Sequence, residues 1–174
     1  TADDIAILAA SSFLKNAMVA IKTAFLVGAT LAILPKFDVE ATVAAIRDHG
    51  VNILTGVPTM MAMLTQRTDL FESVNTDHVR VVSMGSAPAS DALIADIKRT
   101  FPNAEIHLNY GTTEGGPNVT GWYHPDGIPR PPGSVGWPLP DTELKFIGGP
   151  HAREGELWTR NPGVAAGYHK LPEK

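Results

Sequence analysis

The sequence contains no cysteine and few charged residues. Without cysteine, disulfide bonds, zinc–thiolate sites and thiol nucleophiles are all excluded. Charged residues make up 18% of the chain, whereas soluble domains typically contain about 25%. Because charged side chains normally cover the surfaces that face water, the deficit predicts that other protein covers some faces of this chain. The covering protein would be the remainder of the same polypeptide or a second copy in a homo-oligomer.

A basic excess and a long apolar run are also missing. The chain has 14 Lys and Arg against 18 Asp and Glu, a formal net charge of −4, which offers no electrostatic footprint for nucleic acid. The longest uncharged apolar run, Thr23 to Pro35, is shorter than the roughly 20 residues that span a bilayer. No secretion signal is visible, so we expect a cytoplasmic protein without a membrane span.

The first two thirds of the sequence alternate between short apolar strands and helical patterns. Strands are predicted at Thr30–Leu34, Val51–Thr55, Val79–Met84 and Ala104–Asn109. Helices are predicted at Phe13–Val27 and after Asp38, Pro58 and Ser90 or Asp91. The first helix and the first strand are so apolar that we expect both to be buried. The alternation predicts an α/β fold, a mostly parallel sheet flanked by helices.

The composition changes after Gly121. Six prolines between residues 125 and 140 exclude helices from that stretch. Two strands follow, Glu143–Ile147 and Gly155–Arg160, and we expect them to pair antiparallel as the start of a small β subdomain. The sequence therefore predicts an α/β lobe over residues 1–130 and a partial β subdomain over residues 131–174.

Two unusual loops follow successive predicted strands. The first is GSAPAS, Gly85–Ser90, and the second is YGTTEGG, Tyr110–Gly116. Ligands of open α/β sheets bind beyond the carboxyl ends of the strands, so both loops would open onto one crevice if their strands are neighbours.

The residue types in these loops suit a nucleotide. Glycine permits close backbone approach, and Tyr110 offers a flat face to a base. Threonine hydroxyls donate to phosphate, and Glu114 suits Mg²⁺. The alternative is a pair of ordinary strand-to-helix connections, with glycine for turning and threonine for capping.

Five stretches, in order along the chain, resemble motifs of the adenylate-forming (AMP-binding) superfamily. They are VPTMMAML at 57–64, GSAPAS at 85–90, YGTTE at 110–114, PGSVGWPLPDTELKFI at 132–147 and GELWTRNPGVAAGYHKLPE at 155–173. The resemblance covers about residues 20–173. It is strongest to acyl-CoA synthetases and fatty-acid–CoA ligases, and it identifies the chain as an internal fragment of their large N-terminal domain.

The resemblance implies roles for individual residues of the two loops. Residues implied to bind the nucleotide, the first four of them around the adenine, are Gly85, Ser86, Ala87, Pro88, Asn109, Tyr110, Gly111, Thr112 and Thr113. Thr113 and Glu114 are the implied catalytic residues, with Glu114 as the metal ligand. Gly111 and Gly116 would line the substrate pocket. Ser86 departs from the family pattern, which has Gly or Glu there.

The implied activity is that of an ATP-dependent acid–thiol ligase. The complete enzyme would use ATP and Mg²⁺ to convert a carboxylic acid, expected to be a fatty acid, into an acyl-AMP. It would then form a thioester with CoA as co-substrate. The phosphate loop and the C-terminal lysine of the family are not in this sequence, so we expect the chain alone to be inactive. Two alternatives stay open: a non-catalytic nucleotide- or partner-binding α/β module, and an amino-acid or aryl-acid adenylation domain that serves a carrier protein.

Overall fold

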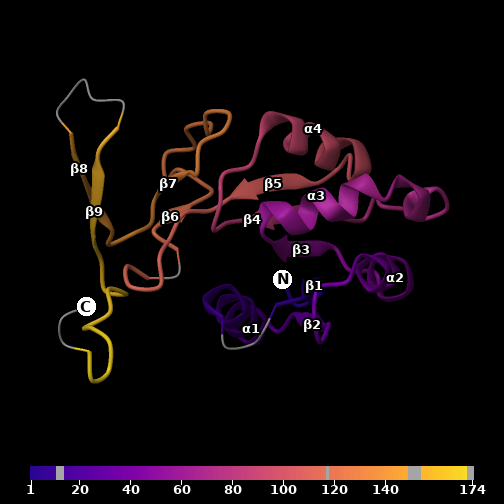
Figure 1. Cartoon of the computed structure of the whole chain (residues 1–174), viewed down its shortest axis with the longest axis horizontal. Helices are drawn as coiled ribbons and strands as arrows, with labels where there is room; N and C mark the ends of the chain where they lie inside the picture. Colours follow the sequence, from indigo (N-terminus) through magenta and orange to yellow (C-terminus); the bar gives the residue numbers. More distant parts are fainter. Residues whose placement is uncertain (11–13, 117, 149–153, 172–174) are drawn as a thin grey trace. The chain divides into compact units, whose positions relative to one another are not determined.

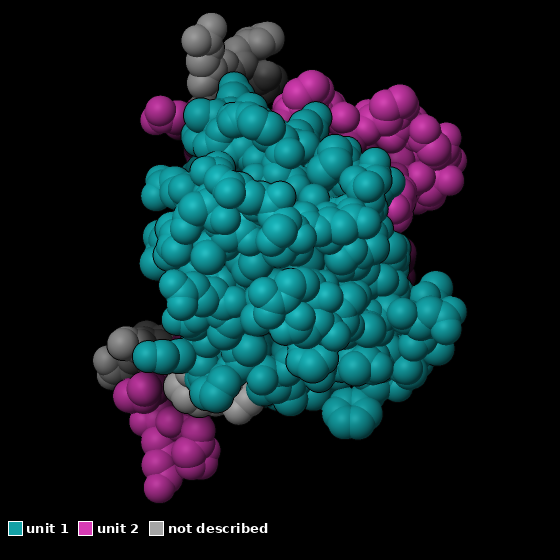
Figure 2. All heavy atoms as spheres, turned by 90° about the vertical axis from the view of Figure 1, so that its right-hand side faces the viewer, with its two compact units in different colours: residues 1–108 teal, residues 109–174 magenta. Residues whose placement is uncertain are grey.

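A computed structural model (Figure 1) describes residues 1–10, 14–116, 118–148 and 154–171. Phe13, the first residue of a predicted helix, lies outside these ranges, as do residues 172–173 of the last motif. The chain forms two compact units, residues 1–108 and 109–174, which Figure 2 colours separately. The predicted boundary at residue 130 falls inside the second unit. The division of the chain into an α/β lobe and a β subdomain stays a prediction. In the described part of the chain, no helix combines the length and the apolarity needed to cross a membrane.

The first unit contains a five-stranded parallel sheet with strand order β2-β1-β3-β4-β5 (Figure 1). Its strands are β1 (Ile5–Leu8), β2 (Thr30–Ile33), β3 (Ile53–Gly56), β4 (Val81–Met84) and β5 (Glu105–Leu108). The predicted parallel α/β fold is confirmed. Strand β1 is absent from the predicted set, because a four-residue apolar run is too short to show a period.

Four helices connect these strands: α1 (Lys15–Val27), α2 (Val39–His49), α3 (Pro58–Gln66) and α4 (Asp91–Thr100). The predicted starts of α2, α3 and α4 are confirmed, whereas the predicted start of the first helix at Phe13 lies outside the described residues. The Asp38 carboxylate accepts a hydrogen bond from Ala41 N at 2.8 Å, and the Ser90 hydroxyl accepts one from Leu93 N at 3.2 Å. Such caps satisfy amide groups that have no partner within the helix. A short 3₁₀-helix, Thr68–Phe71, follows α3.

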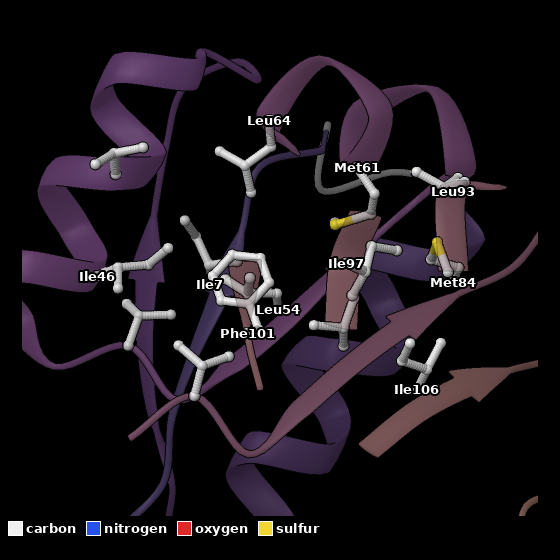
Figure 3. Packing of buried hydrophobic residues seen from close by; sticks show 14 of the residues in the cluster. Ile7, Ile46, Leu54, Met61, Leu64, Met84, Leu93, Ile97, Phe101 and Ile106 are labelled. Carbon is white, nitrogen blue, oxygen red and sulfur yellow. The ribbon is translucent and has the colours of Figure 1, made fainter. Parts of the chain in front are cut away.

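The handedness of the connections decides which face of the sheet each helix covers. The β1-α1-β2 connection runs one way along the sheet, and the later connections run the other way. Since such crossovers are right-handed, α1 lies on one face and α2, α3 and α4 lie on the other. The main hydrophobic core accordingly lies between the sheet and the last three helices. Figure 3 shows Ile46 of α2, Leu64 of α3 and Ile97 of α4 packed around Leu54 and Phe101.

The prediction that the first predicted helix, α1, and the first predicted strand, β2, are buried is wrong. Phe25 and Leu26, in the last turn of α1, are 84% and 85% exposed, and Ile33 of β2 is 67% exposed. Helix α1 has buried alanines, Ala17 and Ala24, on its covered side, and β2 is an edge strand. An apolar pattern shows that a surface requires cover, but not which part of the protein supplies it.

A buried carboxylate joins the starts of three strands. Asp4 precedes β1 and is 3% exposed. Its Oδ1 accepts hydrogen bonds from Arg80 Nε at 2.7 Å and from Asn52 Nδ2 at 3.1 Å, and Arg80 also bonds to Oδ2. Asn52 and Arg80 directly precede β3 and β4. The hydrogen bonds from the Arg80 guanidinium hold the pKa of the Asp4 carboxyl well below its usual range.

Asp4→Asn is expected to destabilise the chain at pH 7 and to flatten its acid sensitivity. The folded-state pKa lies below the ordinary value of 3.8, so the stability contributed by the ionised carboxyl is present above that value and is lost as the pH falls below it. Loss of a charged hydrogen-bond acceptor costs about 1–3 kcal/mol. Urea unfolding at pH 7 and pH 3 measures both effects, with the exposed neighbour Asp3→Asn as the control. Equal losses between these pH values in wild type and Asp4→Asn would contradict the prediction.

The second unit has little regular structure. Strands β6 (Thr120–Gly121) and β7 (Trp137–Pro138) pair antiparallel, and so do β8 (Glu143–Ile147) and β9 (Glu156–Arg160). The second pair confirms the predicted antiparallel strands. The proline-rich stretch between β6 and β8 contains no helix among the described residues, in agreement with the expectation from its composition.

Candidate functional site

The two candidate loops leave neighbouring strands at the same edge of the sheet. Strands β4 and β5 pair in parallel, and their last residues, Met84 and Leu108, are register partners. Gly85 and Asn109 follow these residues directly. The strand adjacency on which the ligand hypothesis depends is therefore confirmed.

The first loop is anchored where it leaves β4 and exposed beyond that point. Gly85 N donates to Gly56 O of β3 at 3.4 Å, and Ser86, Ala87 and Pro88 are exposed. Ser86 has a φ of 71°, in the left-handed region that glycine adopts without strain. The loop therefore keeps a glycine-like backbone at the position where the related motif has Gly or Glu.

The second loop folds back on itself immediately after β5. The half-buried Tyr110 donates from its N to Thr120 Oγ1 at 3.2 Å, and Val119 N donates to Tyr110 O at 2.9 Å. The Thr112 hydroxyl accepts a hydrogen bond from Gly115 N at 2.7 Å. Thr112 thus caps a tight turn, as the alternative reading of this loop expected. Its hydroxyl proton can still donate, so a contact with phosphate stays a prediction for this residue.

The two implied catalytic residues lie at the exposed part of this turn. Thr113 and Glu114 are both exposed. The Tyr168 hydroxyl donates to Oε1 of the Glu114 carboxylate, and Ala165 N donates to Glu114 O at 2.7 Å. The hydrogen bond to Glu114 raises the pKa of the Tyr168 phenol, so this group is protonated, and is a donor, at neutral pH.

The glycines that complete the turn are buried and closely surrounded. A Cβ on Gly115 would lie 2.9 Å from Thr112 Oγ1 and 3.0 Å from Thr159 Cγ2. Gly116 has a φ of 97°, which other residues rarely adopt. Gly115 O accepts a hydrogen bond from Asn161 Nδ2 at 2.8 Å. Close packing accounts for Gly115 and the positive φ accounts for Gly116, and the expected role of Gly116 in a substrate pocket stays a prediction.

A cavity of about 260 Å³ lies beside the turn within the second unit. One wall comes from the turn and the residues after it, and the other from β9 and the segment that follows: Tyr110, Thr112, Glu114, Gly115 and Val119 on the first side, and Leu157, Thr159, Val164 and Ala165 on the second. The cavity brings together three of the predicted site residues, whereas Gly111, Thr113 and Gly116 are outside its lining. Typical pockets for drug-sized ligands measure about 300–1,000 Å³, so this cavity suits part of a nucleotide-sized ligand.

The polar groups suit a metal ion that is held mainly by substrate. The described residues contain no group of three or more His, Asp or Glu side chains that could bind a metal by themselves. Mg²⁺ in nucleotide sites usually takes one or two protein carboxylates and completes its shell with phosphates and water. An exposed Glu114 beside the threonines fits that requirement.

The site residues predicted from the sequence include none from the stretch after β9. The structure places Asn161, Ala165 and Tyr168 against the turn at 114–115. The available signal is the last motif of the resemblance, which contains an asparagine and a tyrosine among small and apolar residues.

The AMP-binding enzyme family matches residues 1–169 of the chain. The chain belongs to this family. AMP-binding enzymes form adenylates, so the sequence-based assignment to the adenylate-forming superfamily is confirmed, together with its α/β fold.

Two proteins that the chain resembles are named as acid–CoA ligases. It is 31% identical over 135 residues to acyl-CoA synthetase 7 of Caenorhabditis elegans, covering 74% of this chain and 24% of that protein. It is 30% identical over 133 residues to 4-coumarate–CoA ligase 1 of Glycine max, covering 72% of this chain and 45% of that protein. The structure of VinN with L-aspartate matches 99% of the chain and 43% of VinN, with a TM-score of 0.81 and 27% identity. The chain thus spans less than half the length of each.

Proposed function

We propose that this chain is part of an ATP-dependent acid–CoA ligase, which activates a carboxylic acid as an acyl-AMP and then forms a CoA thioester. The observation that carries the proposal is the Tyr110–Gly116 turn, which exposes Thr113 and Glu114 directly after the last strand of a parallel sheet. Membership of the AMP-binding family and two CoA-ligase relatives support it.

The first step of such a reaction is electrostatically difficult. A carboxylate oxygen of the acid attacks the α-phosphorus of ATP, and pyrophosphate leaves with the electrons of the broken P–O bond. Both reactants are anions, so donors and cations at the phosphates lower the barrier. A bound Mg²⁺ supplies positive charge to the phosphates. We assign its protein ligand to Glu114 and a phosphate contact to the Thr113 hydroxyl.

The adenine side of the proposed site uses backbone and aromatic surface. Tyr110 would present its ring to the base, together with Asn109. Gly85 and the exposed residues 86–88 would border the adenine through their main chain, as the family resemblance implies. Gly111 and Thr112 complete the proposed nucleotide contacts, and Gly111 and Gly116 the proposed substrate pocket.

Pyrophosphate exchange by the complete enzyme tests the proposal. Radiolabelled pyrophosphate is expected to enter ATP when ATP, Mg²⁺ and a suitable acid are present, and free CoA is expected to be consumed in proportion to AMP released. The acids offered are fatty acids of increasing length, which the motif resemblance favours, 4-coumarate and L-aspartate. Absence of exchange with every acid and absence of ATP binding would favour a non-catalytic module.

A second candidate function has one observation in its favour. VinN, which resembles 99% of this chain, was solved with an amino acid, L-aspartate. An amino-acid or aryl-acid adenylation domain would give exchange with such acids but would leave free CoA unused. Transfer of the acyl group to a carrier protein instead of CoA distinguishes this candidate from a CoA ligase.

A further inference from the structure

Three hydrogen bonds tie the segment Asn161–Tyr168 to the turn that carries Glu114. Asn161 Nδ2 donates to Gly115 O at 2.8 Å, and Ala165 N donates to Glu114 O at 2.7 Å. The third bond is made by a side chain to a side chain, from the Tyr168 hydroxyl to Glu114 Oε1. The backbone of the turn and the carboxylate that it presents are thus held by the same segment.

The segment has internal bonds that fix its own shape. Gly163 N donates to Asn161 Oδ1 at 2.7 Å, and Val164 N donates to Asn161 O at 3.2 Å. Tyr168 forms an isolated antiparallel bridge with Leu171, whose N donates to Tyr168 O at 3.2 Å. The phenol therefore approaches Glu114 from a backbone that is fixed on both sides of it.

The hydrogen bond between Tyr168 and Glu114 contributes little to folding. Glu114 is exposed, and Tyr168 is 46% exposed, so water competes for both groups and two mobile side chains must be ordered. A contact of this kind has its main effect on the conformation of the carboxylate. A carboxylate that is already held in one orientation loses less conformational entropy when it binds a cation.

We propose that Tyr168 is a positioning residue for metal binding, which orients Glu114 toward the magnesium of a Mg²⁺–nucleotide. The inference rests on the proposed role of Glu114 and adds a residue outside the nucleotide-binding loops to that site. Groups that hydrogen-bond to a metal ligand typically change metal affinity by about 10–100-fold when removed. Because the pair is exposed, we expect the lower end of that range.

The test uses Tyr168→Phe in the complete enzyme, which removes the hydroxyl and keeps the ring. Mn²⁺ binding in the presence of a non-hydrolysable ATP analogue, followed by electron paramagnetic resonance, is expected to weaken about 10-fold. The Mg²⁺ concentration that gives half-maximal pyrophosphate exchange should rise by a similar factor, with exchange at saturating Mg²⁺ within about twofold of wild type. His169→Ala, a change at the exposed next residue, serves as the control and should bind Mn²⁺ like wild type.

Glu114→Gln, alone and combined with Tyr168→Phe, separates the proposed role of Glu114 from that of Tyr168. If Glu114→Gln leaves Mn²⁺ affinity unchanged, the proposed role of Glu114 fails, and the inference fails with it. If Glu114→Gln weakens binding but Tyr168→Phe does not, the ligase proposal stands and the positioning role is overturned. Because Tyr168 is inferred to act through Glu114, the double variant should bind no more weakly than Glu114→Gln. Additive losses of Mn²⁺ affinity would show that Tyr168 acts independently of Glu114, and they would overturn the inference.

A second variant distinguishes positioning from a general loss of structure. Glu114→Asp retains the charge but withdraws the carboxylate from the Tyr168 hydroxyl. Its Mn²⁺ affinity is expected to fall about 10-fold and to show no further change when Tyr168→Phe is added. Tyr168→Phe, Glu114→Gln and Glu114→Asp are each expected to have the thermal unfolding midpoint of wild type. A Tyr168→Phe variant whose affinity loss persists in the Glu114→Asp background would overturn the inference regardless of its stability.

Discussion

Glu114→Gln in the complete enzyme is expected to reduce carboxylate-dependent pyrophosphate exchange by about 10²–10³-fold, the usual cost of losing one group on which the electrostatic stabilisation of a transition state depends. Glutamine keeps the size of the side chain and can still accept the hydrogen bond from Tyr168. The negative charge is lost, and with it the attraction for Mg²⁺ at the phosphates. Because Glu114 is exposed, the thermal unfolding midpoint should be unchanged.

The control for this experiment is Glu156→Gln, at an exposed glutamate of β9 in the same unit. It removes the same charge at a position outside the proposed site, and exchange should stay within about twofold of wild type. Exchange by Glu114→Gln at the control level would remove Glu114 from the metal site. A parallel loss in both variants would indicate a non-specific effect of the net charge.

Phe101→Ala is expected to destabilise the 174-residue chain by about 3–5 kcal/mol. The Phe101 side chain is fully buried at the end of α4, and its ring meets Phe71 edge-on with the centroids 5.6 Å apart. The substitution leaves a cavity between the sheet and the helices, and it removes the aromatic pair. Urea unfolding monitored by circular dichroism measures the loss.

Phe25→Ala is the matched control for the core substitution. The same atoms are removed from a side chain that is 84% exposed, so the free energy of unfolding should change by no more than about 0.5 kcal/mol. Comparable losses at both positions would contradict the burial on which the prediction depends. If Phe25→Ala lowers the free energy of unfolding of the complete protein by more than this, another part of the polypeptide covers α1.

Local sequence signals account for most of the first unit. Caps at Asp38 and Ser90 and the proline that opens α3 are short-range features, and each one lies where the sequence predicts it. Strand β1 escapes prediction because it has four residues and no period. The exposure of Phe25 and Ile33 also escapes it, since periodicity identifies an apolar surface without identifying what lies against it.

The candidate site also combines features that the local sequence predicts with contacts that it does not predict. The unusual chemistry of the Tyr110–Gly116 turn is readable from consecutive residues. The contact between Glu114 and Tyr168 joins positions 54 apart in the sequence, and no spacing rule for a turn or helix connects them. The capping bond of Thr112 shows the opposite effect, because a hydroxyl that looks available in the sequence is partly used by its own turn.

The position of β1 inside the sheet determines where this chain can be shortened. Residues Ile5–Leu8 pair with Thr30–Ile33 on one side, and Ala6 pairs with Ile53 on the other. An expression product starting after Leu8 would therefore separate β2 from β3 and leave the backbone groups of both strands unpaired. Unpaired strand edges recruit strands from other molecules, so such a truncation should yield insoluble protein.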